Sequence, residues 1–265
     1  MPPSPLTLAA TSGLRRLAEK DPDPVHLAAA LRHLAKWRSE LVSNTISAKT
    51  GDRVVSGPFK GMHYGVRASE GSRSARLLGV YEASLAPAIE EAVARAYRVV
   101  VDVGSAEGYY AVGLALRLPQ ARVLARDDNP AAQALCRALA ELNGVADRVE
   151  IGGRMDHADF DLCLAQPTLV VCDIEGAEDQ LLDPLRAPGL ARADILVECH
   201  DAMQPGLTDR IAARFAASHD ITRIGRALDT SALPAWMEDW SDLDRLVALW
   251  EWRAGPTPWL WMKAR

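Results

Sequence analysis

The sequence has few features of a secreted, membrane-spanning or disulfide-stabilised protein. Its four cysteines form no C-x-x-C pair and each lies in an apolar run, so we expect reduced, buried thiols at Cys136, Cys163, Cys172 and Cys199. No apolar stretch approaches the roughly 18 residues that a membrane span requires. The first residues also lack a basic region followed by an apolar core. We therefore expect a soluble, cytoplasmic protein that does not bind membranes.

The chain also lacks an excess of positive charge. Its 30 Lys and Arg residues against 35 Asp and Glu residues give a net charge of −5, which disfavours a nucleic-acid partner and leaves a small molecule as the expected substrate. The 265 residues, 49% of them hydrophobic, suffice for one large α/β core with an appendage and require no disulfide or metal for folding.

The first 96 residues are predicted to form a helical N-terminal extension. Apolar side chains recur at spacings of three and four and predict an amphipathic helix over 24–46, on the positions Leu27, Leu31, Leu34, Trp37 and Leu41. Residues 51–65 are rich in glycine and indicate short strands or a loop, and a second helical pattern covers 74–97. The role of this extension is left open between a lid over the substrate and a contact within a homodimer.

From residue 97 to residue 265 short apolar runs alternate with helical patterns, which is typical of βα units on a parallel sheet. Strands are expected near 98–103, 122–126, 148–151, 169–172 and 195–199, and helices near 109–117, 130–143, 158–165, 177–185 and 207–218. Two final strands, 221–224 and 259–262, are separated by an insertion over 225–258. This order predicts an α/β domain with a Rossmann-like, seven-stranded, mostly parallel sheet closed by an antiparallel pair.

One segment has the pattern of a cofactor-binding loop. VVVDVGSAEGYYAVGLAL runs from a β-rich stretch through Gly104 and Gly108 into a helix, which presents backbone N–H groups to a ligand. Asp127 follows Gly104 at about the 20-residue spacing from which a carboxylate reaches ribose hydroxyls. The alternatives are a tight βα turn without a ligand, and an N-cap role for Asp127, which Asp128 or Asn129 would fill better because each lies closer to Pro130.

Four segments in order, VDVGSAEGYYAVGLA, ARDDNPAAQALCRALAELNGVADRVEI, VVCDIEGAEDQLLDP and ILVECHD, resemble class I methyltransferases that use S-adenosylmethionine (SAM). The nearest likeness is to FkbM-type bacterial methyltransferases of small-molecule biosynthesis. The sequence departs from the family pattern at Ala106, where a glycine is usual, and at Arg126, where a large apolar residue is usual. The resemblance implies SAM binding by Asp102, Gly104, Ser105, Gly108, Tyr109, Asp127, Asp128 and Asp156. For Asp156, an N-cap of the next helix explains the residue equally well.

The expected activity is therefore SAM-dependent methylation of a small molecule, with oxygen as the expected acceptor atom. One alternative is an NAD(P)-dependent oxidoreductase, although the loop lacks the regular G-x-G-x-x-G spacing. A second alternative is a non-catalytic scaffold with the same fold, which would bind the cofactor weakly or not at all.

Candidate catalytic residues follow the fourth and fifth predicted strands: Asp173, Glu198 and His200. His200 could act as a general base. Alternatively, a divalent cation such as Mg²⁺ or Mn²⁺ could be held by Asp173, Glu198, His200 and Asp201. A purely structural role for these residues is the competing interpretation, and Glu178 is expected to cap the next helix or face solvent. Six of the seven tryptophans lie between residues 236 and 261, where they either pack in the core or cover the substrate pocket.

Overall fold

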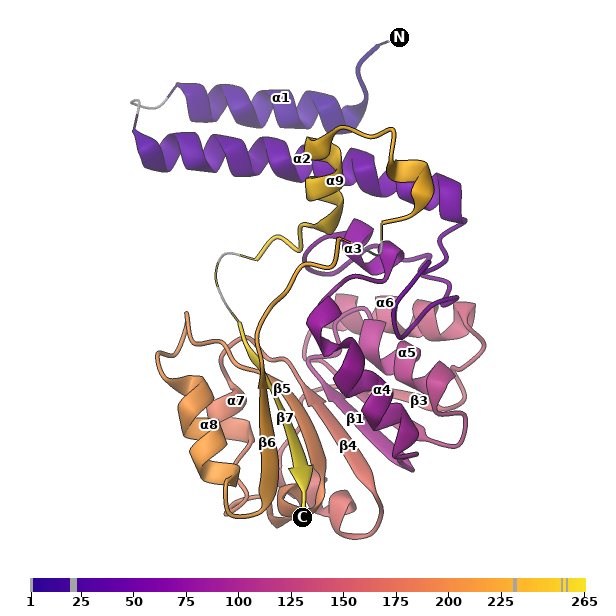
Figure 1. The fold of residues 1–265 in the computed structure, drawn as a ribbon, viewed down its shortest axis with the longest axis vertical. Coiled ribbons are helices and arrows are strands. Elements are labelled where there is room, and N and C mark those ends of the chain that lie inside the picture. Colours follow the sequence, from indigo (N-terminus) through magenta and orange to yellow (C-terminus); the bar gives the residue numbers. More distant parts are fainter. Residues whose placement is uncertain (1, 20–22, 231–232, 254, 256) are drawn as a thin grey trace.

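The computed structural model describes residues 2–19, 23–230, 233–253, 255 and 257–265, and their centre is one seven-stranded sheet (Figure 1). The strands are β1 (Val99–Val103), β2 (Arg122–Arg126), β3 (Val149–Gly152), β4 (Thr168–Cys172), β5 (Asp194–Glu198), β6 (His219–Ile224) and β7 (Trp259–Ala264). They are arranged in the order β3-β2-β1-β4-β5-β7-β6. Only β7 runs antiparallel to its neighbours β5 and β6. The predicted fold class, an α/β domain with a Rossmann-like, seven-stranded, mostly parallel sheet closed by an antiparallel pair, is confirmed.

The central strands form because both of their faces are covered. Every residue of β1, β4 and β5 is buried, as expected for near-continuous apolar runs in a parallel sheet. One apolar cluster joins the sheet to α4 (Ala86–Ala94), α5 (Tyr109–Arg117) and α6 (Pro130–Leu142). A second cluster on the other face includes side chains of α8 (Leu207–Phe215) and of the 3₁₀ helices η2 (His157–Leu164) and η3 (Pro188–Arg192).

Three predicted helices differ in the structure. The helix expected over 74–97 is broken into α3 (Arg73–Leu78), η1 (Ala83–Leu85) and α4, because Gly79 takes a left-handed conformation with φ 76° and ends α3. The helix expected over 158–165 is the 3₁₀ helix η2. The helix expected over 177–185 is only α7 (Glu178–Leu181), and Pro184 disfavours its continuation.

The first part of the predicted N-terminal extension is a helical hairpin that lies at one end of the sheet domain (Figure 1). This hairpin consists of α1 (Pro5–Ala18), which the sequence patterns did not predict, and α2 (Pro24–Thr50), and the rest of the extension, which includes α3, η1 and α4, follows it. The predicted apolar face of α2 is only partly used, since Leu27 and Leu31 are 68% and 70% exposed. Helix α2 instead buries residues of its C-terminal half, among them Val42 and Ile46. None of the described helices is both long enough and apolar enough to cross a membrane.

The predicted insertion over 225–258 folds back onto this hairpin. It contains η4 (Ala235–Met237) and α9 (Asp242–Leu249), and residues 231, 232, 254 and 256 lie outside the described residues. An ion pair holds α9 on α2, with Arg38 Nε 2.6 Å from Asp244 Oδ1. The insertion thus connects the hairpin to β7, next to the carboxyl end of β5.

Candidate functional site

The loops that follow β1, β2 and β4 meet at the carboxyl edge of the sheet. Gly104 N donates a 2.8 Å hydrogen bond to the carbonyl of Arg126 at the end of β2, and Asp173 N donates a 2.9 Å hydrogen bond to the carbonyl of Val103. Ligands of open α/β sheets bind at this edge. The predicted cofactor loop and the predicted catalytic residues therefore share one side of the molecule.

Gly104 is required by the neighbouring strand. It has φ 81°, and a Cβ atom built on it would lie 1.6 Å from the carbonyl oxygen of Asp173. This contact explains the glycine at this position without a ligand. Ala106, which replaces the usual middle glycine, has φ 47°. It keeps the left-handed conformation that a glycine would adopt, so the turn of the loop is preserved.

Asp127 is held against this loop by hydrogen bonds from the backbone. Its Oδ2 atom accepts a 2.9 Å hydrogen bond from Ala106 N, and its Oδ1 atom accepts a 2.8 Å bond from Asn129 N. Helix α6 is capped by the side chain of Asn129, which accepts from Ala131 N at 2.9 Å. Asp127 is therefore not the cap of α6. Because a carboxylate has about four lone-pair sites, each oxygen can still accept a ligand hydroxyl.

Two buried oxygens near the start of the loop have no hydrogen-bond partner among the described residues: Asp102 Oδ2 and Ser105 Oγ. Burial, aided by the charge of Asp127, raises the pKa of Asp102 to about 7 against the opposing effect of a backbone hydrogen bond with Ala111. A buried carboxylate without a partner is costly. A cationic or hydroxyl-bearing ligand at this position would remove that cost.

The other predicted cofactor residues differ in their surroundings. Tyr109 is buried in the core, with ring centroids 5.3 Å from Phe59 and 5.6 Å from Tyr81 in edge-on contacts. Asp128 is exposed. Asp156 is the N-cap residue of η2, and its N–H donates a 2.7 Å hydrogen bond to Asp159 Oδ2. The capping alternative for Asp156 thus has direct structural support.

Glu107 is a loop residue whose role sequence reasoning missed. It is fully buried and accepts hydrogen bonds from Tyr64 Oη at 2.6 Å and Ser69 N at 2.8 Å, and Arg76 Nε lies 2.9 Å away. These contacts join the loop to the segment before α3. In the sequence, Glu107 is the one charged residue of the loop G-S-A-E-G, which could have drawn attention to it. Its partners could not be predicted, because they lie more than 30 residues upstream.

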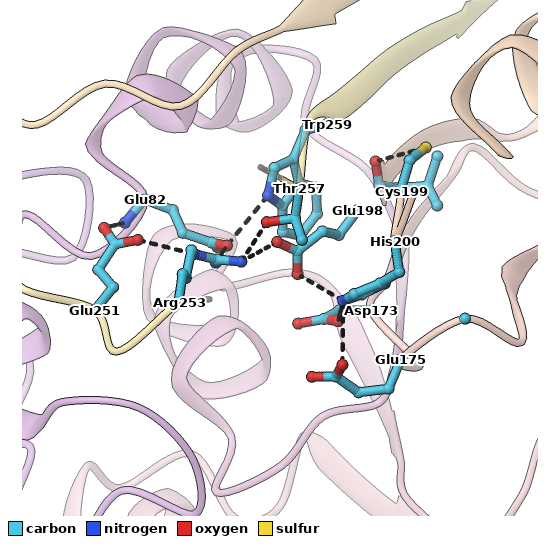
Figure 2. Close-up of polar contacts among 12 residues, drawn as sticks. Glu82, Asp173, Glu175, Glu198, Cys199, His200, Glu251, Arg253, Thr257 and Trp259 are labelled. Carbon is cyan, nitrogen blue, oxygen red and sulfur yellow. Dashed lines mark hydrogen bonds and ion pairs between the residues drawn. The ribbon is translucent and has the colours of Figure 1, made fainter. Parts of the chain in front are cut away.

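His200 lies at the centre of the acidic group beyond β4 and β5 (Figure 2). Its Nδ1 atom is 2.7 Å from Glu178 Oε1. Its Nε2 atom lies 3.4 Å from Glu175 Oε2, 3.6 Å from Asp173 Oδ1 and 3.7 Å from Glu198 Oε2. Glu178 is fully buried, so the expectation that it faces solvent is wrong.

The acidic surroundings shift the pKa values of this group. Burial lowers the pKa of His200, but the hydrogen bond to Glu178 and the charge of Glu198 outweigh it and leave the His200 pKa raised. Desolvation and repulsion from Glu198 and Glu82 hold the pKa of Asp173 well above its usual range. The imidazole is thus stabilised as a cation, and one carboxyl beside it retains a proton more readily than usual.

A second charged group, which sequence reasoning missed, adjoins the first. Arg253, from the insertion, contacts Glu82, Glu198 and Glu251, with its Nε atom 2.9 Å from Glu251 Oε2 (Figure 2). Desolvation and the charge of Glu198 raise the pKa of Glu82 to about 8, while Arg253 and Tyr110 lower it. Glu198 therefore touches both groups, since it contacts Arg253 and His200.

The structure does not bring Asp201 into this site. Its carboxylate accepts hydrogen bonds from the hydroxyl and, at 3.2 Å, from the backbone N–H of Thr208 in the first turn of α8. The potential metal-ligating atoms of Asp173, Glu175 and His200 all lie within 4.8 Å of one another. This group includes Glu175, which was not among the predicted metal ligands, and it does not include Glu198 or Asp201, which were.

No protein-family model matches the chain, and no curated protein matches it. Solved structures do resemble it. An O-methyltransferase from Bacillus cereus in complex with SAH is 12% identical, with a TM-score of 0.46 over 86% of this chain and 90% of that chain. An O-methyltransferase from Streptomyces achromogenes involved in tomaymycin synthesis, in complex with SAM, is 14% identical, with a TM-score of 0.43 over 86% of this chain and 90% of that one. Likeness at this level concerns the fold and leaves the chemistry to the residues of this protein.

Proposed function

We propose that this protein is a SAM-dependent methyltransferase that methylates a hydroxyl group of a small-molecule acceptor. The observation that carries the proposal is the contact between Gly104 of the loop and the carbonyl of Asp173, where an added Cβ atom would lie 1.6 Å from the oxygen. It sets the loop directly against the residue that begins the acidic group around His200. A cofactor in the loop and an acceptor at His200 would then be neighbours, as transfer between bound reactants requires.

The loop residues fit SAM. Asp127 can accept hydrogen bonds from ribose hydroxyls, since both of its oxygens keep free lone pairs. Asp102 Oδ2 and Ser105 Oγ offer buried, unpartnered oxygens to the amino group of the methionine part. When bound, SAM supplies a methyl group on a positively charged sulfur, which an oxygen nucleophile attacks.

His200 is the residue that would take the acceptor proton. With Nδ1 held by Glu178, its Nε2 atom faces Asp173 and Glu175. A neutral Nε2 atom can accept the hydroxyl proton, and the buried carboxylate of Glu178 stabilises the imidazolium that results. Asp173, with Oδ1 unpartnered, can orient the same hydroxyl. A positioned general base contributes about 10²- to 10⁴-fold in rate.

The same group also fits a divalent cation, which is the second route to acceptor activation. Asp173, Glu175 and His200 form a mixed oxygen and nitrogen donor set within 4.8 Å, and Asp173 Oδ1 is buried without a partner. A metal-bound histidine usually donates its other ring N–H to a carboxylate, and Glu178 lies 2.7 Å from His200 Nδ1. Such a cation would lower the pKa of the acceptor hydroxyl.

Two measurements test the proposal. Thermal shift should show stabilisation by S-adenosylhomocysteine (SAH) and none by NADH, because the loop residues match SAM and lack the dinucleotide spacing. A screen of hydroxylated acceptors with radiolabelled SAM should then give a labelled methyl ether. Stabilisation by NADH alone would favour the oxidoreductase, and no binding of either cofactor would favour the scaffold.

A further inference from the structure

A cavity of about 310 Å³ adjoins the charged group around Arg253. Its walls come from α2, from α9 and the residues after it, and from the segment that follows β6. They are Ala35, Arg226, Leu228, Leu246, Val247 and Trp250, together with Glu251 and Arg253. Small-molecule sites in proteins enclose about 300–1,000 Å³, so this cavity could hold a compact molecule of one or two rings.

The cavity lies next to the proposed reaction site. Arg253, in the cavity wall, contacts Glu198 Oε1, and Glu198 Oε2 lies 3.7 Å from His200 Nε2 (Figure 2). One carboxylate thus separates the cavity wall from the proposed proton acceptor. We propose that this cavity holds the body of the methyl acceptor, an inference that rests on the proposed function.

The walls define the body of this acceptor as apolar. Leu228 and Leu246 are 53% and 59% exposed, although both line the cavity beside Trp250. Covering apolar surface is favourable by about 25 cal/mol per Å². A ligand with an aromatic or aliphatic skeleton would therefore gain affinity here, whereas a sugar-like ligand would not.

The charges define the two ends of the acceptor. Arg253 is neutralised by Glu82, Glu198 and Glu251. Arg226 is exposed and has no ion pair or hydrogen bond to another residue within the described ranges. Arg226 can therefore receive an anionic group, while the carboxylates beside His200 repel one.

The acceptor class follows from this polarity. It is an apolar molecule with a carboxylate, phosphate or sulfate at the end that faces Arg226. The hydroxyl to be methylated lies at the opposite end, because a neutral hydroxyl is the group that the carboxylates around His200 can accept as a hydrogen-bond donor.

The test uses two fluorescent probes that share one apolar skeleton, 8-anilinonaphthalene-1-sulfonate and its uncharged analogue N-phenyl-1-naphthylamine. Titration of the full chain without cofactor should show one site for each probe. The sulfonate should bind about two- to fivefold more tightly, the range expected of an exposed ion pair. Arg226→Gln should abolish this preference. Arg223→Gln should retain it, since Arg223 is exposed on β6, pairs with Asp209 and does not line the cavity.

Leu246→Asp should weaken both probes, because it places a charge in the apolar wall without touching the sheet. Equal affinity of the two probes for the wild-type protein, or a preference that survives Arg226→Gln, would overturn the assignment of the anionic end. Unchanged binding in Leu246→Asp would overturn the cavity as the site. Calorimetry with SAH on the same preparations separates the two proposals. Normal SAH binding with failed probes overturns only this inference. Failed SAH binding with normal probe binding overturns the proposed function, and with it the role of the cavity as the acceptor site.

Discussion

His200 Nδ1 lies 2.7 Å from Glu178 Oε1, and this contact fixes the orientation of the imidazole ring. Glu178 Oε1 is itself held by the backbone N–H groups of Ile174 and Gly176, each at 3.2 Å. The hydrogen bond with His200 and the backbone bond from Gly176 lower the pKa of Glu178 against the opposing effect of its burial. The last glutamate of the D-x-E-G-x-E segment is thus a positioning residue for the histidine that follows the next strand.

Glu178→Gln should reduce methyl transfer about 10- to 100-fold, as is typical when a residue that orients a histidine is lost, and leave SAH binding unchanged. It should also move the pH profile. Glu178 raises the His200 pKa, so without its charge the imidazole becomes neutral at a lower pH, and the rising limb of rate against pH shifts downward. Glu141→Gln, on the exposed side of α6, is the matched control. A profile that does not move in Glu178→Gln would contradict the role.

Asp127→Ala should weaken SAH binding by about 1–3 kcal/mol, because ribose hydroxyls would lose a charged acceptor. The loop also loses the bond from Ala106 N, so the folded state must be checked by circular dichroism. Isothermal calorimetry measures the dissociation constant, and Asp147→Ala, at an exposed position, serves as control. Wild-type affinity in a folded Asp127→Ala variant would remove this residue from the cofactor site.

Gly104→Ala should destabilise the protein far more than Gly144→Ala. Both glycines have positive φ, 81° and 66°, so both variants carry the left-handed strain of about 1–2 kcal/mol. Only at Gly104 would the new Cβ meet a backbone oxygen, at 1.6 Å, while at Gly144 no atom lies within 4 Å. Chemical denaturation of both variants isolates the contact with Asp173. Equal losses of stability would mean that β4 can move away from the loop at little cost.

Asp102→Asn should change how stability depends on pH. The folded-state pKa of Asp102 is about 7, against about 3.9 for an unfolded chain. Between these values the folded state keeps a proton that the unfolded state releases, so this group makes stability fall as pH rises from about 4 to about 7. Asparagine cannot ionise, so between pH 5 and pH 7.5 the melting temperature of the variant should fall less than that of the wild type.

The same Asp102→Asn variant should bind SAH more weakly, since a neutral amide replaces the acceptor of a cationic amino group. Together the two results would show that Asp102 strengthens cofactor binding and lowers the stability of the folded protein. A pH dependence equal to that of the wild type would mean that Asp102 is ionised in the folded protein throughout this range.

Sequence patterns predicted the sheet well because its strands are short apolar runs with glycine or proline between them. Helix α5 begins and ends where it was predicted, at Tyr109 and Arg117, since glycine precedes it and its residues are uniformly apolar. Helix α1 was not predicted, and its 14 residues bury only Ala10 and Gly13. The apolar spacing in α2 correctly predicted a helix, but it did not indicate which face of that helix is buried.

The site was predictable only where a residue follows directly from its own strand. Asp127, Asp173 and His200 each come at or just after the carboxyl end of a strand, so the parallel sheet brings them to the same edge. Arg253 and Glu82 are 171 residues apart, and no local pattern links them. Their contact depends on how the insertion folds back over the sheet edge, which single-sequence patterns do not specify.

His200→Ala and Asp173→Asn should each reduce methyl transfer far more than they reduce SAH binding, because both residues lie on the acceptor side of the loop. If His200 is the general base, its loss should cost about 10²- to 10⁴-fold in rate. The residual activity should then rise with pH as the acceptor ionises unaided, and EDTA should leave the wild-type rate unchanged.

If a divalent cation activates the acceptor, EDTA should abolish wild-type turnover and Mg²⁺ or Mn²⁺ should restore it. Binding of Mn²⁺ can be followed by electron paramagnetic resonance without any acceptor. Glu175→Gln and Asp173→Asn should each weaken Mn²⁺ binding, since Glu175 and Asp173 both supply ligand oxygens. Asp201→Asn is the control, because its carboxylate holds Thr208 rather than the His200 group. If both His200→Ala and Asp173→Asn retain the wild-type rate and no metal is required, the acidic group has only a structural role. Catalysis would then depend on proximity and orientation alone.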